Sequence, residues 1–189
     1  LSLMARLGSS QPVVLARSLD ELAEGFDLSN FGAAPTKFDE HPDLRINGVV
    51  LDPKVFLQEV HNLKKKGYLK DDSQLVIDGN VHIIMPWHVA VDLAREKSAD
   101  RKIGTTGRGI GPTYEDKIGR RGIRLYELVK PHLLRKRIKE LLPEKNFLLD
   151  QYFGEPTLDE ERIFQEYSDY ARQIEQHLGC TSTLLDQSI

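Results

Sequence analysis

The spacing of apolar residues predicts two amphipathic helices in the first half of the chain. One begins after Asp52-Pro53, a pair suited to a helix N-terminus, and ends at Gly67. The other begins at Pro86 and runs to about Lys97. The apolar positions at helical spacing are Phe56, Val60 and Leu63 in the first, and Trp87, Val91 and Ala94 in the second.

Two more helices are expected in the second half. Apolar residues at helical spacing mark one of them around 134–141, and its other positions are largely basic. Thr157 and Glu160 have capping-box spacing, so we expect the next helix to start there and to stop at Gly179. The apolar positions are Leu134, Ile138 and Leu141, followed by Ile163, Phe164, Tyr167, Tyr170, Ile174 and Leu178.

Strand signals are few. Gln74–Asp78 reads as a β-strand, and Val81–Met85 as a second strand or an extended loop. The pattern as a whole therefore predicts a helix-rich α/β fold with about five helices and one or two strands.

The run Gly104–Arg124 concentrates glycine, threonine and arginine. Glycine lets the backbone adopt positive φ and lets a ligand approach the main chain. Successive N–H groups, hydroxyls and guanidinium groups together suit a phosphate or carboxylate. The run matches neither a phosphate-binding loop with Gly-Lys-Ser/Thr nor a dinucleotide fingerprint. It predicts either an anion cradle or a plain glycine-rich surface loop.

Two other groups of side chains have candidate chemistry. Glu115 and Asp116 are adjacent acids that could hold a metal or act in acid–base chemistry, but we favour structural ion pairs with neighbouring arginines. His88 could be a ligand, and hydrogen-bonded packing is the favoured interpretation. No catalytic residue and no metal ligand is therefore assigned.

A basic zone follows the glycine-rich run. RNA phosphate is one conceivable partner for it. No aromatic residue alternates with these charges, as binding of a single strand would require, so we expect no nucleic-acid site. The zone consists of Arg120, Arg121, Arg124, Arg135, Lys136, Arg137 and Lys139.

Composition narrows the class of protein. The chain has 189 residues, of which 40% are hydrophobic and 29% charged, with a formal net charge of −3. This composition suits a globular domain and gives no general attraction to anionic surfaces. Its single cysteine, Cys180, fits a reducing compartment, and no apolar run is long enough for a membrane span. We therefore expect a cytoplasmic protein without membrane contact.

The glycine-rich run resembles the signature of the adenylosuccinate synthetase family. Flanking segments extend the resemblance from about Arg45 to Gln187, roughly three quarters of the chain. The segments that carry it are Ile46–Pro53, Met85–His88, Leu93–Glu96 and Leu184–Gln187. The resemblance implies part of a P-loop-like synthetase domain, here lacking most of its central sheet.

The resemblance also implies an activity. The family joins inosine monophosphate (IMP) to L-aspartate with GTP and Mg²⁺, as a GDP-forming ligase in purine biosynthesis. By position, Thr106 corresponds to a threonine that binds the IMP phosphate. Arg120 corresponds to an arginine that reaches IMP in the partner subunit of a homodimer, and Arg108 to one near the substrate pocket.

Other family motifs do not occur in this sequence. They include the Gly-Asp-Glu-Gly-Lys-Gly-Lys phosphate loop, which carries the catalytic aspartate and binds GTP and Mg²⁺, and the segment with the catalytic histidine. The resemblance therefore implies an internal fragment with part of the IMP site and part of the dimer contact. The alternative is a catalytically inactive fragment or fusion product with residual nucleotide or RNA binding.

Residues 1–44 do not fit this family. A helix is expected over Ser18–Leu28, where Ser18 and Glu21 have capping-box spacing. The segment from Met4 to Glu40 resembles glutamyl-tRNA synthetase just after its ATP loop. We therefore expect a helical segment at 1–44, a junction near 41–45, and the synthetase fragment at 45–189. A divergent N-terminal extension is the alternative.

Overall fold

The computed structural model describes residues 3–4, 15–16, 44–46, 50–98 and 107–179. Two short strands, β1 (Leu3–Met4) and β2 (Leu15–Ala16), pair antiparallel. The helix expected over Ser18–Leu28 lies outside the described residues.

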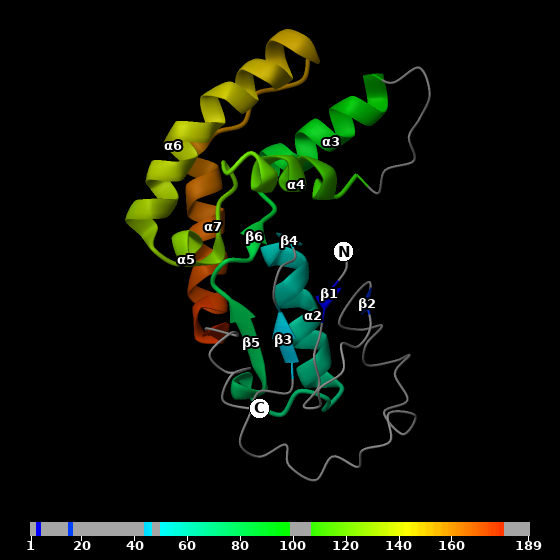
Figure 1. Cartoon of the computed structure of the whole chain (residues 1–189), viewed down its shortest axis with the longest axis vertical. Coiled ribbons are helices and arrows are strands. Elements are labelled where there is room, and N and C mark those ends of the chain that lie inside the picture. The colour runs from blue at the N-terminus through cyan, green and yellow to red at the C-terminus, as the bar shows by residue number, and fades with distance from the viewer. Residues whose placement is uncertain (1–2, 5–14, 17–43, 47–49, 99–106, 180–189) are drawn as a thin grey trace.

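Two small parallel sheets lie among the helices (Figure 1). In the larger sheet β5 (Leu75–Asp78) lies between β3 (Leu44–Ile46) and β7 (Leu178–Gly179). In the smaller sheet β4 (Val50–Leu51) pairs with β6 (His82–Ile83). The prediction of a strand near 74–78 is confirmed. The partner strands are only two or three residues long, which is too short for a periodic signal in the sequence.

The helices make up most of the described chain, so the expected helix-rich α/β class is confirmed. They are α2 (Pro53–Lys65), α3 (Pro86–Ser98), α4 (Ile110–Ile118), α5 (Leu125–Leu128), α6 (Pro131–Phe147) and α7 (Glu160–Ile174). Short turns of other helix types follow at η2 (Asp72–Gln74), η3 (Leu148–Tyr152, a π-helix) and η4 (Glu175–His177).

The start of α2 follows the sequence prediction. The carboxylate of Asp52 accepts hydrogen bonds from the backbone N–H groups of Lys54 and Val55, at 3.0 and 3.2 Å. Pro53 occupies the first helical position, where its missing N–H has no consequence. The predicted apolar stripe of this helix is buried.

Two predictions for the last helix are wrong. Its N-cap is Asp159, whose carboxylate accepts from the Arg162 N–H at 2.7 Å, and not Thr157. Leu178, assigned to the apolar stripe, belongs to strand β7, because the helix ends at Ile174 and η4 redirects the chain. Aspartate and threonine are both good N-caps, so the sequence alone does not choose between them.

The main core lies between the strands and helices α2, α5, α6 and α7. Trp87, Leu125 and Ile138 are fully buried in it. Tyr167 on α7 donates a hydrogen bond from its buried hydroxyl to the carbonyl of Ile84 at 2.8 Å. A smaller cluster joins α3 to the π-helix through Val91, Ala94 and Leu149. No described helix is long and apolar enough to cross a membrane.

The packing of α6 gives a first test. We expect Ile138→Ala to lower the free energy of unfolding by about 2–5 kcal/mol, because it leaves a cavity in the core. Lys139→Ala, at the exposed neighbouring position, is the matched control and should change it by less than about 0.5 kcal/mol. Urea unfolding followed by circular dichroism measures both. Equal effects of the two changes would contradict this packing.

Candidate functional site around helix α4

The glycine-rich run is not one continuous loop, because its second half forms helix α4. Gly107 and Gly109 have φ values of 63° and 73°. Gly109 is the N-cap of α4, and a Cβ there would lie 2.7 Å from the Val89 backbone nitrogen on α3. Its N–H donates to the Asp92 carboxylate at 2.9 Å. The glycine therefore permits close helix–helix packing as well as the turn.

The other end of α4 is a Schellman motif with an unusual occupant. Arg120 has a φ of 58°, the left-handed region in which glycine normally ends a helix. Its N–H donates to the Lys117 carbonyl at 3.2 Å. The next two N–H groups, of Arg121 and Gly122, both donate to the Asp116 carbonyl, at 2.8 and 3.0 Å. We call residues 119–122 the arginine turn.

Asp116 is the buried centre of this region, with 1% of its surface exposed. Its carboxylate receives a hydrogen bond from Lys145 Nζ on α6 at 2.8 Å, and lies 3.0 Å from His88 Nε2 on α3. Burial acts to raise the pKa of Asp116, but hydrogen bonds from His88 and Lys145 outweigh it and lower the pKa to about 2. The carboxylate is therefore ionised at neutral pH and joins three helices.

His88 serves as a neutral donor to Asp116. Its Nδ1 accepts the Met85 N–H at 2.9 Å, so the proton of the neutral ring belongs on Nε2, facing Asp116. The indole N–H of Trp87 points at the same Nε2 at 3.0 Å, so it competes with Asp116 for this nitrogen, and the ionised carboxylate is the stronger partner for an Nε2–H. Burial lowers the pKa of His88, in keeping with an uncharged ring. The packing interpretation of this histidine, favoured from the sequence, agrees with these contacts.

The adjacent acids do form structural ion pairs, but mainly with partners the sequence did not indicate. Glu115 binds Arg95 on α3 through two hydrogen bonds, of 2.5 and 2.9 Å. The main cationic partner of Asp116 is Lys145, 29 residues away, and Arg121 is more distant at 3.7 Å. No local pattern points to Lys145, because the contact depends on how α6 packs.

Of the three predicted site residues, the structure describes two, Arg108 and Arg120. Arg108 and Arg120 are exposed at opposite ends of α4, and within the described residues neither guanidinium has a hydrogen bond or ion pair. Thr106 lies outside the described residues. The described chain also contains no cluster of three or more acids, histidines or cysteines that could hold a metal ion.

The segment after the arginine turn packs tightly against β6. A Cβ at Gly122 would lie 2.4 Å from Cδ2 of His82. The N–H of Ile83 donates to the Ile123 carbonyl at 2.8 Å. Burial, with the positive charges of Lys117 and Arg124, lowers the pKa of His82 to about 4. This histidine is therefore neutral and structural.

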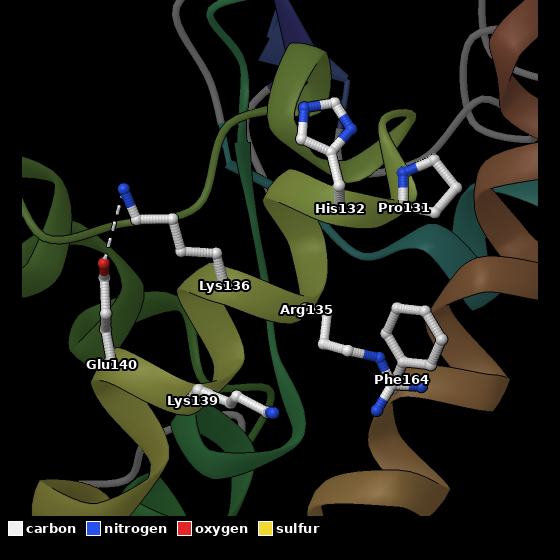
Figure 2. A pocket seen from close by; sticks show the side chains of 7 residues that line it. All are labelled: Pro131, His132, Arg135, Lys136, Lys139, Glu140 and Phe164. Atoms are coloured by element: carbon white, nitrogen blue, oxygen red, sulfur yellow. Dashed lines mark ion pairs between the residues drawn. The ribbon is translucent and has the colours of Figure 1, made fainter.

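The basic zone is largely neutralised by acids of the chain itself. A cavity of about 630 Å³ lies along α6, where Figure 2 shows Arg135 against the ring of Phe164 from α7. The Arg135 guanidinium is 3.6 Å from the ring centroid and also binds Glu161 at 2.7 and 3.2 Å. Lys136 pairs with Glu140 at 3.8 Å. These contacts favour a solvated helix face over a nucleic-acid site.

Fold and site together define part of a helix-rich α/β domain, with exposed arginines at the two ends of the helix that follows the glycine turn. The family model for adenylosuccinate synthetase matches residues 40–189. The chain belongs to the adenylosuccinate synthetase family.

Individual relatives agree. The chain is 65% identical over 144 residues to adenylosuccinate synthetase of Syntrophotalea carbinolica, covering 76% of this chain and 33% of the relative. For the enzyme of Geobacter metallireducens the identity is 55%, covering 76% of this chain and 34% of the relative. The solved structure of fully ligated adenylosuccinate synthetase from Plasmodium falciparum is 23% identical, with a TM-score of 0.64 over 77% of this chain and 34% of that chain. The chain thus spans about a third of the length of these relatives.

The buried histidine of β6 predicts a pH dependence of stability. Its pKa falls from the ordinary 6.5 to about 4, so the unfolded chain binds the proton more readily between these values. Its contribution, about 3 kcal/mol, is present above pH 6.5 and is lost as the pH falls toward 4. We expect His82→Asn to flatten this part of the stability–pH profile. The exposed His132→Asn is the control, and a profile changed equally by both would refute the assignment.

Replacing the left-handed arginine of the arginine turn by glycine should stabilise the protein. We expect Arg120→Gly to raise the free energy of unfolding by about 0.5–1 kcal/mol, because glycine adopts the left-handed conformation without steric cost. Arg120→Lys keeps the Cβ and should leave stability unchanged. Chemical denaturation measures both variants. A destabilised Arg120→Gly protein would mean that the guanidinium itself supports the fold.

Proposed function

We propose that this chain supplies part of the IMP site and part of the subunit contact of an adenylosuccinate synthetase. The observation that carries the proposal is Arg120, a charged residue in a glycine-type conformation whose exposed guanidinium has no partner among the described residues. A strained position occupied by a charged residue suggests a role outside the fold. A guanidinium presents paired donors that match phosphate.

In the proposed arrangement two subunits complete each IMP site. Thr106 and the start of α4 belong to one subunit, and Arg120 of a second copy reaches the same nucleotide. Arg108 stands beside the glycine pair that begins α4 and contacts the substrate from within its own subunit. The exposed positions of the two arginines at opposite ends of one short helix support a division between subunits.

The complete reaction in the family joins IMP and L-aspartate with GTP and Mg²⁺. We infer that the groups that bind GTP and Mg²⁺ come from outside these 189 residues, since the phosphate-loop run of the family does not occur in the sequence. Without them the electrostatic stabilisation of the transferring phosphoryl group is lost. The proposed setting is purine biosynthesis in the cytoplasm.

A catalytically inactive fragment that keeps IMP binding is the second candidate. RNA binding is not favoured, because several cations of the basic zone already have acidic partners. Both candidates share IMP binding, and they differ in whether groups outside these 189 residues complete a working enzyme.

IMP binding by the purified chain tests the proposal. We expect Arg120→Ala to weaken IMP binding at least about tenfold in calorimetry, the cost of a lost charged hydrogen bond. Arg162→Ala, an exposed arginine on α7, is the control and should bind as the parent does. Mixing Thr106→Ala chains with Arg120→Ala chains should restore some of the sites if the arginine acts across the dimer.

The same samples, supplied with GTP, Mg²⁺ and aspartate, should form no adenylosuccinate. Measurable product from the 189-residue chain would show that the phosphate-moving groups are present after all. Unchanged IMP affinity in Arg120→Ala would remove this arginine from the substrate site.

A further inference from the structure

We propose that Asp116 is a positioning residue for Arg120: its buried carboxylate, held between α3 and α6, fixes the turn that presents the guanidinium. The role of Arg120 toward substrate rests on the function proposed above. The control of the turn by Asp116 rests on contacts within the described residues alone.

Asp116 connects the arginine turn to helices α3 and α6 through its own atoms. Its side chain contacts His88 and Lys145 at 3.0 and 2.8 Å, and so is fixed relative to α3 and α6. Its backbone carbonyl accepts the N–H groups of Arg121 and Gly122 at 2.8 and 3.0 Å. These two hydrogen bonds close the arginine turn, with Arg120 at its left-handed position. A shift of Asp116 therefore moves the turn directly.

The turn has further contacts: the Arg121 guanidinium binds Glu144 on α6 at 2.8 and 3.0 Å, and Gly122 packs against His82. A left-handed arginine returns to an ordinary conformation once its closing hydrogen bonds weaken. The carbonyls of the turn are bound by Arg137, whose Nη2 donates to the Arg121 carbonyl at 2.8 Å and the Gly122 carbonyl at 3.5 Å. Arg137 holds carbonyls that follow Arg120, whereas Asp116 holds the amides, so the two anchors can be separated by mutation.

An aspartate suits this position for an electrostatic reason. Two donors, the His88 Nε2–H and the Lys145 ammonium, face its carboxylate. An asparagine keeps one acceptor oxygen and turns an NH₂ group toward one of those donors, which leaves a donor unpaired in a buried place. Asp116→Asn is therefore a near-isosteric change that weakens the anchor. Lys145→Met is a second, independent way to weaken it from the α6 side.

A double-mutant cycle on IMP affinity tests the positioning role. Asp116→Asn should weaken IMP binding at least about fivefold when Arg120 is present, and should have no further effect in the Arg120→Ala background. A purely structural role predicts the same loss in both backgrounds, and that result would overturn the proposal. If Arg120→Ala itself has no effect on IMP, the proposed function fails and the next measurement decides the positioning role.

Amide hydrogen exchange examines the turn without substrate. In Asp116→Asn and Lys145→Met we expect the Arg121 and Gly122 amides to exchange about tenfold faster, with amides of α7 unchanged. Lys139→Ala, a change at an exposed position of α6, is the control and should leave these two amides protected. Unchanged protection in both Asp116→Asn and Lys145→Met would refute the proposal even if IMP binding were altered.

Discussion

A buried carboxylate must be compensated, and around Asp116 this requirement determines how three helices meet. An ionised acid without partners is strongly unfavourable away from water. Here the compensation comes from His88 on α3 and Lys145 on α6, and the acid itself belongs to α4. The three helices cannot move apart without leaving this charge unpaired. The region between the sheets and the end of α6 is therefore held by polar contacts as much as by apolar packing.

Close backbone contact adds a second constraint on the same region. Gly109 brings the start of α4 against the backbone of α3, and Gly122 brings the chain after the arginine turn against His82. Any side chain at either position would push α4 away from its neighbours. The glycines of the run therefore permit both turns and close packing. The sequence alone does not show which glycine has which role.

The sequence predicted the helices that have a local N-terminal signal and an apolar stripe several turns long. The helices α2 and α3 follow from an N-terminal cap or proline and a periodic apolar stripe, and Leu134, Ile138 and Leu141 are buried as expected on α6. Helix α4 was missed because its nine residues include a glycine and a proline, and glycines stand at both of its caps, within a run typical of loops. Strands β4, β6 and β7 were missed or left open because two residues show no alternation.

Residues around helix α4 could be predicted from the sequence only where the signal is local, as for the secondary structure. The exposed arginines Arg108 and Arg120 could be named from the resemblance, because they belong to one contiguous run. Asp92 and Lys145 could not be assigned, because their partners lie 17 and 29 residues away and are brought near only by helix packing. The residues proposed to contact a ligand could thus be named from the sequence, whereas the residues that pack around them could not.

The left-handed conformation of Arg120 costs stability, and no described contact of its side chain offsets that cost. A glycine at position 120 would end α4 at lower conformational cost. The chain instead has its glycine one position earlier, at Gly119, where φ is an ordinary −69°. The arginine is therefore not explained by the fold, and its exposed side chain gives the fold no described contact in return. A cation at this position fits the role proposed for Arg120 toward a ligand. The hydrogen bonds of Asp116 and Arg137 with the arginine turn then hold this strained conformation in place.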